Sequence, residues 1–182
     1  MKQSTLLDGK KFQITLRRLC QQLIETHQEF EDVVFIGIQP RGTFLAQRLQ
    51  EEIYEMTQVK VKLGLLDITF YRDDFRQKGS GPIIANSTEI DFIIDDKKVV
   101  LMDDVLWTGR TIRSAMDALQ AFGRPTKIEL LVLVDRRFSR EIPIQPDFIG
   151  MQVDTIDSQR VSVEWEEVDD KDSIMLLTEP ND

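Results

Sequence analysis

Histidine and cysteine are nearly absent from this chain of 182 residues, which contains one of each. Catalytic triads and most zinc sites need histidine or several cysteines, so this scarcity argues against both. Cys20 has no partner for an internal disulfide, and its apolar-periodic surroundings predict a packed core thiol. His27 follows the first amphipathic pattern in a polar stretch, where we expect a solvated loop residue without a catalytic role.

Long apolar runs and an excess of positive charge are also missing. No stretch approaches the roughly 20 apolar residues that cross a bilayer, and residues 1–11 lack the apolar segment of a secretory signal. We therefore expect a cytoplasmic protein. The formal net charge of −9 argues against a broad electrostatic grip on nucleic acid, because such binding relies on Lys and Arg. A local basic patch is still compatible with this charge.

The composition, 41% hydrophobic and 30% charged, is ordinary for a globular protein, and the length predicts a single domain over residues 1–182. Hydrophobic periodicity predicts helices at 9–25, 43–54 and 112–122, and strands at 33–38, 59–69, 98–102, 128–134 and 161–165. This alternation predicts an α/β fold with a doubly wound, mostly parallel sheet flanked by helices. The polar residues 72–91 predict a mobile loop, since long unstructured segments in compact domains tend to be functional lids.

Residues 99–111 carry the clearest functional pattern. A buried strand ends in Asp103 and Asp104, and a short glycine-containing loop then leads into a helix. Loop N–H groups and the positive end of the helix dipole can bind a phosphate, and the hydroxyls of Thr108 and Thr111 can donate to it. Carboxylates would repel a phosphate, so Asp103 and Asp104 fit better as acceptors for ribose hydroxyls. Because open α/β sheets bind ligands at strand ends, we expect a phosphorylated ribose here.

This segment resembles the phosphoribosyl pyrophosphate signature of type I phosphoribosyltransferases. Within that family, the blocks 37–42, 67–74, 133–136 and 140–144 are similar to the PyrR group, pyrimidine-operon regulators with uracil phosphoribosyltransferase activity. The resemblance implies a type I phosphoribosyltransferase fold with a small covering region. It also implies assembly into a homodimer or larger homo-oligomer.

The resemblance also implies roles for residues outside the signature. In the family, the loop that matches Pro40 and Arg41 binds pyrophosphate with the help of a cis peptide bond, here expected between these two residues. Arg72 begins the segment that matches the family's mobile loop. Pattern and resemblance together give catalytic roles to Arg41, Arg72, Asp103 and Asp104. They give substrate binding to Pro40, Arg41, Asp103, Asp104, Val105, Leu106, Trp107, Thr108, Gly109, Arg110 and Thr111, to Asp135 and Arg136 near the base, and to Val161 in the covering region.

The implied reaction converts uracil and phosphoribosyl pyrophosphate to UMP and pyrophosphate. Positive charge develops on the ribose and negative charge on the departing pyrophosphate, so catalysis should rest on electrostatic stabilisation and positioning. Mg²⁺, held mainly by substrate oxygens with few protein ligands, would neutralise the leaving group with help from Arg41 and Arg72. We assign no general base.

Two other functions stay open. One is a transferase that acts on a purine base, because the sugar-phosphate motif is shared across bases. The other is an RNA-binding attenuator of pyrimidine genes that senses nucleotides. Against it, Gln145 and Met151 stand where the family usually has basic residues, and Phe138 and Ser139 form an altered insertion. We therefore expect weak RNA binding. The candidate RNA contacts are Arg17, Arg18, Arg137 and Arg140.

Overall fold

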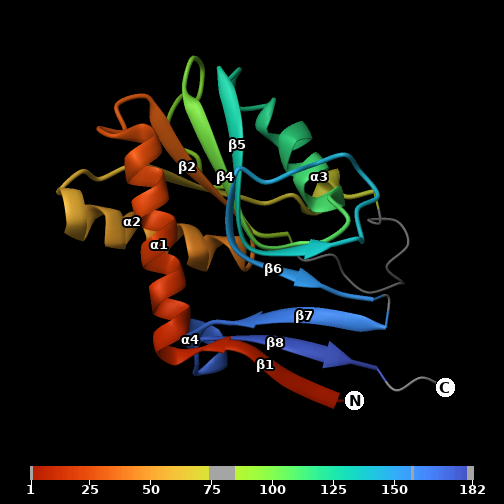
Figure 1. The fold of residues 1–182 in the computed structure, drawn as a ribbon. Helices are drawn as coiled ribbons and strands as arrows, with labels where there is room; N and C mark the ends of the chain where they lie inside the picture. The colour runs from red at the N-terminus through yellow and green to blue at the C-terminus, as the bar shows by residue number, and fades with distance from the viewer. Residues whose placement is uncertain (1, 74–84, 157, 180–182) are drawn as a thin grey trace.

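The computed structural model describes residues 2–73, 85–156 and 158–179 (Figure 1). In this part of the chain, five parallel strands form the central sheet in the order β3-β2-β4-β5-β6. Their bounds are β2 Val33–Ile38, β3 Lys62–Leu66, β4 Lys98–Leu106, β5 Lys127–Arg137 and β6 Phe148–Asp154.

Helices cover both faces of this sheet, as Figure 1 shows. On one face lie α1 (Gly9–His27) and α2 (Gly42–Thr57), whose apolar residues pack in one core cluster with Val100 and Met102 of β4. On the other face lies α3 (Arg110–Leu119), which packs against Val99 and Leu101 of the same strand. Alternate residues of β4 thus enter two cores, which confirms the predicted doubly wound fold.

A separate antiparallel sheet of three strands in the order β1-β8-β7 forms the small covering region below the central sheet in Figure 1. Its strands are β1 (Lys2–Asp8), β7 (Gln159–Glu164) and β8 (Ser173–Thr178), and the short helix α4 (Glu166–Asp169) connects the last two. Of these strands, the sequence predicted only β7. The strand β1 is mostly exposed and polar and pairs with β8 at the far end of the chain, so its local pattern is weak.

Several predicted boundaries are wrong, and two of them concern strands that lead to the site. The loop expected from Asp103 begins later, because β4 continues to Leu106 and its last residues pair with Val134 and Asp135 of β5. The strand expected at 59–69 is shorter, since β3 ends at Leu66 where β2 ends, and a 3₁₀ turn follows at Thr69–Tyr71. The carboxylates of β4 are therefore fixed by a sheet rather than by a loop.

The expectation for His27 is also wrong. Helix α1 continues to this residue, and its side chain is only 1% exposed, between the rings of Phe30 and Phe148. Its Nε2 lies 2.8 Å from Oε2 of buried Glu129, but the two atoms do not meet the geometry of a hydrogen bond. Burial lowers the pKa of His27 although this carboxylate opposes the shift. The polar sequence around His27 misled the prediction, because the contact with β5 is tertiary.

Cys20 is buried, and burial raises the pKa of its thiol to about 12, which confirms a packed core thiol. The predicted mobile loop falls largely on residues 74–84, outside the described residues. Among the helices of the described ranges, none combines the length and apolarity needed to span a membrane.

Candidate functional site

A cavity of about 790 Å³ lies at the carboxyl ends of β2 and β4, and residues of β7 in the covering sheet also line it. It brings together residues that the sequence separates by more than a hundred positions. Asp135 is the one predicted site residue that does not line it. The predicted residues that do are Pro40, Arg41, Arg72, Asp103, Asp104, Val105, Leu106, Trp107, Thr108, Gly109, Arg110, Thr111, Arg136 and Val161.

The loop after β2 contains a cis peptide bond, but it joins Gln39 to Pro40 and not Pro40 to Arg41 as predicted. The physical reason is that the nitrogen of proline forms a tertiary amide, for which the cis form costs far less than for other residues. The loop is held by Thr43, whose hydroxyl donates to the Pro40 carbonyl at 2.6 Å. A Cβ on Gly42 would lie 2.6 Å from the Met102 carbonyl oxygen, so glycine lets α2 begin directly against β4.

Arg41 connects this loop to the covering region. Its Nη1 donates to Oδ2 of Asp169 at 2.7 Å and to the Val163 carbonyl at 2.8 Å. The same carboxylate oxygen accepts the Trp165 N–H at 2.9 Å, which fixes its position. The hydrogen bond with Asp169 raises the pKa of Arg41. The guanidinium is thus held at the cavity wall as a permanent positive charge.

Asp103 and Asp104 stand side by side at the end of β4. Asp103 accepts the N–H of Asp104 at 3.0 Å, and Asp104 accepts the N–H of Val105 at 2.8 Å. Burial raises the pKa of both carboxyls, and the charge of Asp104 raises that of Asp103 further. A buried acid beside a half-buried one is costly unless a ligand supplies donors or positive charge. Ribose hydroxyls and a divalent cation are two such ligands.

The loop between β4 and α3 has the form of an anion site. Gly109 takes φ +92°, which favours glycine, and α3 starts at the next residue. The hydroxyl of Thr108 accepts the N–H of Arg110 at 3.4 Å. The side chain of Arg110 pairs with Asp73 and, at 2.6 Å, with Glu141. Apart from the Arg110 N–H, the backbone N–H groups at the start of α3 could bind a phosphate.

Trp107 and Arg136 also line the cavity. The indole is 52% exposed, and the Arg136 guanidinium lies over it. Arg136 itself is buried and donates to the Thr155 hydroxyl and the Gln159 carbonyl. This flat aromatic surface beside a cation suits a planar base.

Several further residues line the cavity that the sequence interpretation did not assign to it. Some lie in the blocks 37–42, 67–74 and 140–144 that carry the resemblance, and the alternating pattern of residues 159–164 could have suggested more than Val161. The additional lining residues are Ile38, Gln39, Ile68, Asp73, Ile112, Glu141, Ser158, Gln159, Arg160, Ser162, Val163 and Glu179.

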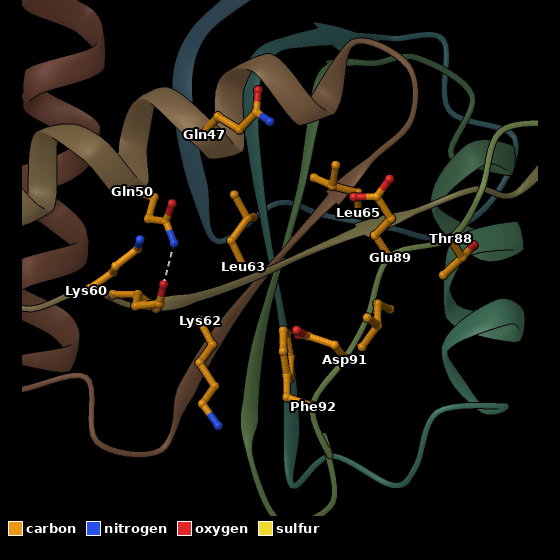
Figure 2. Close-up of a pocket in the computed structure, with 12 residues that line it drawn as sticks. Gln47, Gln50, Lys60, Lys62, Leu63, Leu65, Thr88, Glu89, Asp91 and Phe92 are labelled. Atoms are coloured by element: carbon orange, nitrogen blue, oxygen red, sulfur yellow. Dashed lines mark hydrogen bonds between the residues drawn. The ribbon is translucent and has the colours of Figure 1, made fainter.

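A second hollow, about 910 Å³, lies beside the edge strand β3 (Figure 2). Its wall includes Gln50, which donates to the Val61 carbonyl at 2.6 Å, and side chains of mixed charge such as Lys62 and Asp91. It has no glycine loop or helix start and lies along a strand rather than at strand ends. We therefore place the candidate site in the first cavity.

Comparisons with known proteins agree with this geometry. A family model described as phosphoribosyl transferase domain matches residues 2–168. The chain is 46% identical over 177 residues to the bifunctional protein PyrR of Desulfosudis oleivorans, covering 97% of each. It is 46% identical over 173 residues to the bifunctional protein PyrR of Limosilactobacillus fermentum, covering 94% of this chain and 96% of that protein.

Solved structures show the same fold at low identity. A hypoxanthine phosphoribosyltransferase of Staphylococcus aureus aligns with a TM-score of 0.70 at 20% identity, over 97% of this chain and 93% of that one. One of Trypanosoma cruzi aligns with a TM-score of 0.72 at 13% identity, over 97% and 91%. By the matched domain and the near full-length similarity to PyrR proteins, this chain belongs to the phosphoribosyltransferase family and, within it, to the PyrR group.

Proposed function

We propose that this chain is a uracil phosphoribosyltransferase that converts uracil and phosphoribosyl pyrophosphate to UMP and pyrophosphate. One observation carries the proposal. A single cavity joins the acids of β4, the glycine loop at the start of α3, and Arg41. These groups match, in order, the hydroxyls, the 5-phosphate and the pyrophosphate of the substrate.

Each group then has one task. Asp103 and Asp104 accept the ribose hydroxyls and place negative charge beneath the ring, where positive charge develops as the anomeric bond breaks. The loop N–H groups bind the 5-phosphate and fix the ribose in place. Arg41 and Arg72 stabilise the departing pyrophosphate, and Trp107 with Arg136 offers a surface for the base.

The site also fits magnesium. The carboxylates of Asp103 and Asp104 at the cavity are hard oxygen donors, which this ion prefers. Bound mainly by the substrate, magnesium would supply charge neutralisation for pyrophosphate. Arg41, fixed by Asp169, would supply the remaining positive charge from the protein.

The decisive experiment measures pyrophosphate release by the purified protein with phosphoribosyl pyrophosphate, magnesium and a panel of uracil, hypoxanthine, guanine and adenine. We expect turnover with uracil alone. Preference for hypoxanthine or guanine would replace the proposal by a purine transferase. Absence of release with every base, despite measurable nucleotide binding, would leave a sensor without catalysis.

A second candidate function is RNA-dependent regulation, and the name bifunctional carried by the relatives favours it. The candidate arginines are already engaged. Arg17 pairs with Glu52 at 2.9 Å, Arg18 donates to carbonyls of β6, and Arg137 forms two bonds with Asp154. Met151 packs against the core. RNA contacts would compete with the existing partners of these arginines, and the net charge of −9 opposes RNA binding, so we keep catalysis as the main proposal.

A further inference from the structure

The segment Arg140–Ile144 packs against the loop that joins β4 to α3, and of its residues only Glu141 lines the cavity. Its Glu141 and Ile142 N–H groups both donate to the Thr108 carbonyl, at 3.0 and 3.1 Å. Arg140 donates through Nη1 to the Trp107 carbonyl. The same segment therefore donates hydrogen bonds to two successive carbonyls of the loop, those of Trp107 and Thr108.

This arrangement determines where the loop N–H groups point. In a trans peptide the N–H lies opposite to the C=O of the same unit. Holding the Trp107 carbonyl outward turns the Thr108 N–H inward, and holding the Thr108 carbonyl does the same for the Gly109 N–H. Among the described residues, neither N–H has a hydrogen-bond partner, and Thr108 and Gly109 line the cavity.

The other nitrogens of the Arg140 guanidinium also form hydrogen bonds. Its Nη2 pairs with Asp135, a buried residue whose second oxygen accepts from Gln152 at 3.4 Å. Its Nε donates to the Ile144 carbonyl at 3.2 Å, and its side chain is 23% exposed. The planar guanidinium thus joins the end of β5 to the loop with several bonds, which a flexible lysine could only partly replace.

We propose that Arg140 is a positioning residue for the phosphate loop, held by Asp135 and acting through the Trp107 carbonyl on the Thr108 and Gly109 N–H groups. This inference rests on the proposed function, since it assigns those N–H groups to the ribose 5-phosphate. It also gives Asp135, which does not line the cavity, a role in holding Arg140. Arg140 is then engaged in the site and is not a free cation for RNA.

The test compares two ligands that occupy different ends of the cavity. Calorimetry measures binding of ribose 5-phosphate and of inorganic pyrophosphate to the full chain and to Arg140→Met and Arg140→Lys. We expect Arg140→Met to weaken ribose 5-phosphate binding by about tenfold or more, since misdirected donors lose charged hydrogen bonds. Pyrophosphate, bound near Arg41, should keep its affinity. Arg140→Lys should recover part of the lost affinity.

Two further variants serve as a folded alternative and as a control. Arg140→Met leaves Asp135 buried without its partner, so the double variant with Asp135→Asn provides a folded alternative. Arg137→Met is the matched control, because this neighbouring arginine pairs with Asp154 and does not contact the loop. Unchanged ribose 5-phosphate affinity in the folded Arg140 variants, or an equal loss for both ligands, would overturn the inference. Absence of ribose 5-phosphate binding by the unsubstituted protein would instead overturn the proposed function and the inference with it.

Discussion

The guanidinium of Arg136 lies over the indole of Trp107, with its Cζ 4.8 Å from the ring centroid. A base that enters the cavity would meet the half-exposed ring, whereas Trp165, the other tryptophan, is fully buried. We therefore expect UMP to change the intrinsic fluorescence through Trp107. Titration with Trp107→Phe should lose this signal while calorimetry still detects binding. An undiminished signal in that variant would place the base elsewhere.

Asp104→Asn should weaken binding of phosphoribosyl pyrophosphate with magnesium, and folding should survive. The carboxylate is proposed to accept ribose hydroxyls, and hydrogen bonds to charged groups contribute about 1.5–3 kcal/mol, or roughly tenfold or more in affinity. Calorimetric titration measures the loss. Asp91→Asn, on the second hollow, is the control. Equal affinity and equal uracil turnover in Asp104→Asn would remove this residue from the site.

Asp103→Asn should stabilise the folded protein at neutral pH while reducing activity. Because burial raises the folded pKa, the folded state holds its proton at pH values where the unfolded state has lost it. The folded protein with Asp103 thus loses stability as the pH rises from the unfolded-state pKa of about 3.8 through the raised folded-state pKa. Urea unfolding at several pH values should show an advantage for the variant that grows with pH. The exposed Asp117→Asn should show none.

His27 should make the protein less stable as the solution is acidified below its ordinary pKa of 6.5. Its folded pKa is lowered, so the unfolded state takes up the proton first, and stability present above 6.5 is lost as pH falls through this range. His27→Leu should flatten the pH dependence of unfolding between about pH 8 and pH 6, where most carboxylates do not titrate. Glu129 keeps Lys127 as a partner at 2.6 Å. An unchanged slope would show that another group is responsible.

RNA should bind weakly or not at all at physiological salt. The net charge is −9, and Arg17 and Arg137 already pair with carboxylates of the chain. The measurement titrates a pyrimidine-operon leader hairpin and a scrambled RNA of equal length in the presence of UMP. Binding seen only at low ionic strength counts as nonspecific attraction. Submicromolar, sequence-selective binding at about physiological salt would contradict the prediction.

The sequence by itself determined the parts of the protein whose pattern is local. Alternating strands and helices predicted the doubly wound sheet, and residues 99–111 predicted a strand, a glycine loop and a helix in the order that the structure has. These signals are readable because hydrophobic periodicity, a strand end and a glycine turn each depend on neighbouring residues.

Only the tertiary structure decided the rest. It paired β1 with β8 across the length of the chain, buried His27 beside Glu129, and placed Arg41 against Asp169. It also bonded Arg140, a candidate RNA contact, to the Trp107 carbonyl and to Asp135. The physical reason is common to all four. A side chain's partner is chosen by packing and charge between distant segments, and a local pattern does not contain that information.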